Sequence, residues 1–149
     1  MDKLDDYQSD YNSAKAHQDF NSFPDGTWTV KITGADGTDG GTNGAITYLP
    51  SISIFFEVQG QPDETEESPF YGSMGCLKLT FKEGKNAQIS ASVLKTLLQE
   101  LGVEITLAQF RDPRFTKMLR GFVINLTKVT NVSGERGYAN FKHFKFVSA

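Results

Sequence analysis

The feature that most constrains the fold is a long stretch of alternating side chains at residues 46–82, where two strand-like runs flank an acidic loop. Along residues 46–58 one parity is apolar: Ile46, Tyr48, Ile52, Ile54, Phe56 and Val58. Along residues 70–82 apolar side chains alternate with small or basic ones: Leu77, Leu79 and Phe81 against Cys76, Lys78, Thr80 and Lys82. A period of two predicts strands with one buried and one exposed face. Pro50, Gly72 and Gly75 predict bends, which a small barrel needs.

Three more strands and a helix follow from the rest of the pattern. Strands are predicted at residues 27–33, 121–129 and 138–147, and the apolar stripe of residues 86–101 predicts a helix that ends at Gly102. In residues 138–147, Phe141 and Val147 share one parity and Phe144 and Phe146 the other, so the pattern does not predict which side is buried. Five glycines in residues 34–45 predict a flexible hairpin loop.

Three strands, a helix and two strands form the order of the OB-fold, a five-stranded Greek-key barrel. We therefore predict an all-β chain, an OB-fold five-stranded barrel (β-β-β-α-β-β) with an additional N-terminal helix. A generic α+β sheet with a covering helix is the alternative. The predicted domains are an acidic helical arm at residues 1–22 and the OB-fold domain at residues 23–149. A chain of 149 residues is long enough for one core.

The N-terminal arm has a one-sided apolar stripe within residues 3–20, formed by Leu4, Tyr7, Tyr11 and Ala14. Such a stripe predicts packing on the parent domain or on a second copy, which makes the helix a candidate homodimer interface. The alternative is an acidic arm that competes with nucleic acid for a basic surface.

Charge is distributed unevenly between the two halves of the chain. Residues 1–75 hold 3 Lys or Arg against 13 Asp or Glu, a net of −10, and residues 76–149 hold 12 against 5, a net of +7. A basic half is compatible with a polyanionic partner. The simpler interpretation is two solvated surfaces that attract each other within the fold or across a dimer.

Several classes of function have no support in the sequence. Cys76 is the only cysteine, and His17 and His143 are far apart, so we predict no disulfide, no metal site and no cofactor. No catalytic motif is present, and we predict that the protein is not an enzyme. The polar N-terminus and the lack of an apolar run long enough to span a membrane predict a cytoplasmic protein with no membrane partner.

The chain resembles a family of small phage-encoded OB-fold proteins from replication and recombination cassettes, considered to be single-stranded DNA-binding proteins. The resemblance rests on residues 23–28 (FPDGTW), 52–58 (ISIFFEV), 94–102 (LKTLLQELG) and the Gly137-Tyr138 pair. It implies single-stranded DNA as partner, with replication or recombination proteins as further partners. If a phage encodes the chain, the expected location is the host cytoplasm. The chain ends in Phe146-Val-Ser-Ala149 rather than in the acidic tail with a final Phe that bacterial single-strand-binding proteins use for recruitment.

OB-folds bind single strands with cations along the backbone and rings under the bases, on the second and third strands and the flanking loops. The predicted stacking residues are Phe55, Tyr71 and Tyr138, and the predicted phosphate contacts are Lys31, Lys78, Lys82, Arg136 and Lys142. Each has a structural alternative. Phe55 would cover an apolar patch under the N-terminal helix or at a dimer interface, Tyr71 would be a buried corner residue, and the lysines would serve solubility.

Three functions follow as hypotheses. The first is sequence-independent single-stranded DNA binding. The second is a protein-interaction or virion-associated module on a β-barrel scaffold that binds no nucleic acid. The third, an enzyme, requires clustered carboxylates or a triad, whereas the acidic residues lie mostly in predicted loops and in the arm.

A basic cluster follows the predicted helix, formed by Arg111, Arg114, Lys117 and Arg120. It would bind phosphate outside the DNA-binding groove of the OB-fold or pair with the acidic half of the chain.

Overall fold

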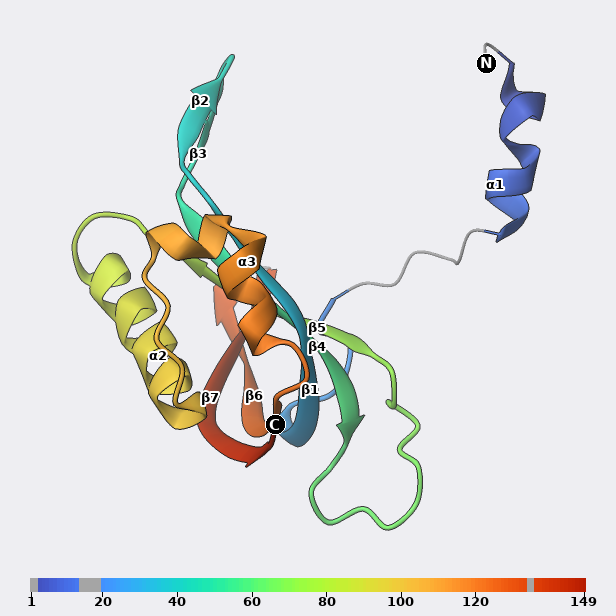
Figure 1. The fold of residues 1–149 in the computed structure, drawn as a ribbon, viewed down its shortest axis with the longest axis vertical. Helices are drawn as coiled ribbons and strands as arrows, with labels where there is room; N and C mark the ends of the chain where they lie inside the picture. The colour runs from blue at the N-terminus through green and yellow to red at the C-terminus, as the bar shows by residue number, and fades with distance from the viewer. Residues whose placement is uncertain (1–2, 14–19, 134–135) are drawn as a thin grey trace.

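A computed structural model describes residues 3–13, 20–133 and 136–149, and the fold is mostly β (Figure 1). The elements in chain order are η1 (Leu4–Tyr7), α1 (Gln8–Ser13), β1 (Gly26–Thr38), β2 (Gly41–Asn43), β3 (Ile46–Tyr48), β4 (Ser51–Gly60), β5 (Met74–Thr80), α2 (Lys85–Leu101), η2 (Ala108–Arg111), α3 (Pro113–Thr116), η3 (Lys117–Leu119), β6 (Val123–Ser133) and β7 (Arg136–Ser148).

Five strands form one antiparallel sheet in the order β5-β4-β1-β6-β7, and β2 and β3 form a small second sheet. The predicted order of three long strands, a helix and two strands is therefore confirmed. The predicted closure of this sheet into a barrel is not confirmed. Among the described residues no ladder joins β5 to β7, so the sheet is open along that line.

The open sheet is nevertheless strongly curled around its core. The ring of Phe56 in β4 lies 5.3 Å from that of Phe141 in β7, edge to face, although β1 and β6 separate the two strands in the sheet. Phe23 contacts both rings, and all three are buried. Helix α2 contacts both edge strands, β5 and β7. It is fixed to them by the Ser90 hydroxyl, which donates to the Thr80 carbonyl, and by Glu100, which accepts from the N–H of Phe146.

The alternating pattern predicted the buried faces well where the strands are regular. The inward residues of β1, β4 and β6 are buried: Trp28, Val30, Ile32, Ile52, Ile54, Phe56, Val58, Ile124 and Leu126. In α2 the leucines are buried and Ile89 is exposed. Gly102 ends the helix with the predicted left-handed conformation, at φ 68°.

The prediction for residues 34–45 was wrong in part. Residues 34–38 continue β1 and pair with residues 51–55 of β4, because ladder hydrogen bonds outweigh the low strand preference of glycine. Only the remainder forms a hairpin, β2–β3, which projects from the body in Figure 1. Pro50 separates β3 from β4, so Ile46 and Tyr48 belong to the hairpin and are exposed rather than inward.

Two other predicted strands change at irregular positions. The strand predicted from residue 70 begins at Met74, because residues 68–73 form turns with Gly72 at φ 84°. The mixed parity of β7 results from a bulge: His143 has φ 56°, and the register with β6 shifts between Asn125 and Thr127. Phe141 and Phe144 consequently both face the core side.

The described residues confirm the first part of the helix predicted at 3–20. Residues 4–13 are helical, residues 14–19 lie outside the described residues, and so do the side chains of Tyr11 and Ala14. Leu4 is 91% exposed, so this member of the stripe does not pack on the sheet. In the described part of the chain, no helix has the length and hydropathy of a membrane span.

Candidate nucleic-acid interface

The outer face of β1, β4 and β5 carries the central residues predicted to bind nucleic acid. Phe55 in β4 lies opposite Gly34 in β1 and Cys76 in β5, so small neighbours flank its half-buried ring. The next outward position, Ser53, lies between Asp36 and Lys78. Lys78 is therefore a diagonal neighbour of Phe55, at about 7–8 Å for such pairs.

Lys31 is on the same face but farther along, opposite Glu57. Lys31 and Lys78 are both exposed. The face carries Glu57 and Asp36 as well as the two lysines, so it is mixed in charge rather than a continuous basic stripe. Ring stacking therefore has to contribute a large share of any affinity for a polyanion.

The other predicted residues lie away from Phe55. Tyr71 is exposed in the turn before β5, so it is not a buried corner residue. Lys82 lies beyond the end of β5, where its N–H donates to Asn86 Oδ1 at 2.8 Å. Tyr138 and Lys142 are exposed on β7, which β1 and β6 separate from β4. The side chain of Arg136 lies outside the described part of the structure.

A residue of the predicted N-terminal segment contacts Phe55, in line with the structural alternative for this ring, although the sequence did not predict which residue. The ring of Phe20 lies 5.7 Å from that of Phe55, tilted by 43°. The next residue, Asn21, is joined to the free edge of β5 by three hydrogen bonds. Its N–H donates to the Met74 carbonyl at 2.9 Å, its Nδ2 donates to the Cys76 carbonyl at 3.1 Å, and its Oδ1 accepts from the Cys76 N–H at 2.9 Å.

A groove of about 700 Å³ lies between the β2–β3 hairpin and the outer ends of β4 and β5. Its lining from the hairpin includes Thr42, Thr47 and Tyr48, and its lining from the sheet includes Ser51, Lys78 and Thr80. Tyr48 is 52% exposed. Sequence reasoning missed it as a surface ring, although Pro50 was a signal that the strand breaks beside it.

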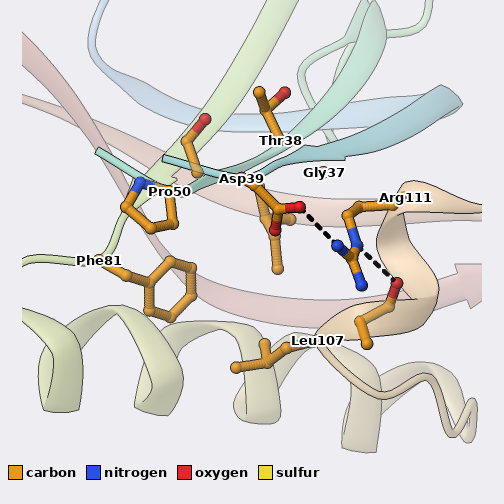
Figure 2. Close-up of a pocket in the computed structure, with 10 residues that line it drawn as sticks. Gly37, Thr38, Asp39, Pro50, Phe81, Leu107 and Arg111 are labelled. Atoms are coloured by element: carbon orange, nitrogen blue, oxygen red, sulfur yellow. Dashed lines mark hydrogen bonds and ion pairs between the residues drawn. The ribbon is translucent and has the colours of Figure 1, made fainter. Parts of the chain in front are cut away.

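A smaller pocket of about 330 Å³ lies between the β1–β4 ladder and η2 (Figure 2). Pro50, Phe81 and Leu107 form its apolar side, and Arg111 lies at its edge, bonded to Asp39 and to the Ala108 carbonyl. This pocket is adjacent to the groove, because Asp39 lines both.

Among the described residues, two ion pairs connect the acidic and basic halves of the chain, as the simpler interpretation of the charge asymmetry predicted. One is Arg111 with Asp39, and the other is Lys128 with Asp25 at 3.2 Å. Within the basic segment, Arg114 pairs with Asp112. Internal pairing therefore accounts for part of the positive charge of the second half.

Asp25 and Cys76 are among the groups whose pKa values are shifted. Hydrogen bonds from the Thr130 hydroxyl and N–H, with Lys128 adding its charge, lower the pKa of Asp25. Burial raises the pKa of the Cys76 thiol. A raised pKa reduces the thiolate fraction, so Cys76 is not an activated nucleophile.

Comparison with known proteins leaves the family open: no family model and no curated protein matches the chain. Among the described residues, no group of three or more His, Cys, Asp and Glu side chains is placed to hold a metal ion. Function has to be inferred from the strand order and from the chemistry of the outer face.

Proposed function

We propose that this protein is a sequence-independent single-stranded DNA-binding protein with an OB-fold. The strand order supports the fold: β1, β4, β5, β6 and β7 take the places of barrel strands one to five, and α2 connects the third to the fourth. In the described part of the chain no ladder joins β5 to β7, which is compatible with a partly open barrel. In this fold, oligonucleotides bind on strands two and three, here β4 and β5, beside the loop after strand one.

The observation that carries the proposal is an aromatic ring on the outer face of β4 with a lysine diagonal to it on β5. The residues directly opposite Phe55 are the small Gly34 and Cys76, so no large side chain lies directly across from the ring. A base that stacks on Phe55 would bring its phosphate towards Lys78, and each such stack contributes about 1–3 kcal/mol.

The groove extends this face towards the hairpin. Tyr48 supplies a second ring at the groove's wall, and Lys78 lies at the boundary between groove and open sheet. A strand that passes from Phe55 into the groove would meet alternating ring and cation contacts, the combination that binds single strands without reading their sequence. Lys31 extends the path in the opposite direction.

Fluorescence anisotropy of a labelled oligo-dT tests this proposal. We expect binding at low salt that weakens steeply as salt is added, because phosphate contacts release counterions. Phe55→Ala should weaken binding about ten-fold if one stack is lost. The matched control is Phe146→Ala, which removes a 42% exposed ring on β7 and should leave affinity unchanged. No detectable binding at low salt refutes the proposal.

The biological setting proposed here, DNA replication and recombination in a phage-type cassette, rests on the family resemblance. A homodimer through the N-terminal helix belongs to the same proposal, because Leu4 is left exposed there. If oligo-dT does not bind, the alternative of a protein-interaction or virion-associated module on the same scaffold becomes the better account.

A further inference from the structure

The segment before β1 lies over the ring that the proposed function uses for stacking. Phe20 contacts Phe55 on the outer face of the sheet, and Phe20 is itself 47% exposed. A nucleotide base that stacks on Phe55 needs the same solvent-facing surface of the ring. The two rings are tilted by 43°, so no parallel gap for a base exists between them.

The segment is fixed to the sheet rather than resting on it. The side-chain amide of Asn21 pairs with both main-chain groups of Cys76, as a neighbouring strand would, and its own N–H pairs with Met74. Asn21 adopts φ 62°, a left-handed conformation that asparagine tolerates better than most residues. On the other side, Phe23 is buried in the core. Phe20 is thus held next to Phe55 by attachments on its C-terminal side.

We propose that Phe20 is a built-in competitor for the nucleic-acid site, a strap that covers Phe55 in the free protein and leaves it when a base stacks there. This inference rests on the proposed function. It differs from the acidic-arm alternative, because Phe20 would compete through its ring and not through the negative charge of the arm. A site that is open for only a fraction of the time binds with an apparent affinity reduced by that fraction.

The test compares oligo-dT binding of four forms of the full chain: wild type, Phe20→Ala, Phe55→Ala and the double variant. Aromatic pairs of this kind have modest energies, so Phe20→Ala should tighten binding about 2- to 10-fold. In the Phe55→Ala background the same change should have no effect, because the ring that Phe20 covers is gone. Ile89→Ala, which shortens a 63% exposed side chain on α2 away from the proposed site, is the control and should bind as wild type.

The outcomes separate the two proposals. If no form binds oligo-dT at low salt, the proposed function itself fails. If wild type binds and Phe20→Ala binds equally well or more weakly, the function stands and the competitor role of Phe20 is refuted. Weaker binding would make Phe20 a contact for DNA. A gain of the same size in both backgrounds would also refute the role, because it would not act through Phe55.

Discussion

Replacing Gly75 with alanine should destabilise the fold through one contact. Gly75 in β5 lies directly opposite Phe56 in β4, and a Cβ at this position would come within 3.0 Å of the Cε2, Cζ and Cδ2 atoms of that ring. The ring has no space to retreat, because it is 3% exposed and packs against Phe141 and Phe23. Added volume in a well-packed core typically costs about 1–3 kcal/mol, which we expect for Gly75→Ala.

Urea unfolding followed by the fluorescence of Trp28 measures this cost, since Trp28 is the only tryptophan and is buried. The urea midpoint should fall, while the dependence of the unfolding free energy on urea concentration should not change. The thermal midpoint should fall by about 2–4 °C for each kcal/mol of lost stability. Gly34→Ala is the matched control, also a glycine inside a strand, with no atom within 4 Å of the added Cβ. Equal midpoints for Gly75→Ala and wild type would refute this description of the core.

Two pKa shifts lead to further predictions. Because the folded state lowers the pKa of Asp25, the stability it contributes is complete above its ordinary value of 3.8 and is lost as the pH falls through the lowered value. In wild type the urea midpoint of unfolding should therefore fall at acid pH, and Asp25→Asn should make this fall less steep. If the fall is as steep in Asp25→Asn as in wild type, the contacts of Asp25 with Thr130 and Lys128 are contradicted. Because burial raises the pKa of Cys76, its alkylation rate should reach half-maximum at a higher pH than that of a free cysteine. A midpoint at or below that of free cysteine would contradict the burial.

The alternating pattern was sufficient to predict β4, because each residue from Ile52 to Val58 obeys it and the side chains pack accordingly. The same pattern placed Phe55 on the outer face and Lys78 beside it. It failed for residues 34–38, where pairing with β4 makes a strand from a glycine-rich segment. Local preference carries no information about such a partner.

The remaining differences arise from contacts between distant parts of the chain. The bulge at His143 is defined by the register of β7 against β6, which composition does not reveal. Phe20 contacts Phe55 from 35 positions away in the sequence, and no local motif around Phe20 indicates this contact. Asn21 hydrogen-bonds the main chain of Cys76, 55 positions away in the sequence. Its attachment to the edge of β5 is therefore visible only in the folded chain.

The central claim is that the outer face of β4 and β5 binds single-stranded DNA. The most direct test is NMR, in which the backbone amide chemical shifts of the isotope-labelled protein are followed as oligo-dT is added. If the outer face of β4 and β5 binds single strands, the largest changes should cluster at residues 53–55 and 76–78 and along the β2–β3 hairpin. The N–H of Cys76, which Asn21 holds in the free protein, should be among them. Changes confined to β6 and β7, or none at saturating DNA, would contradict the account.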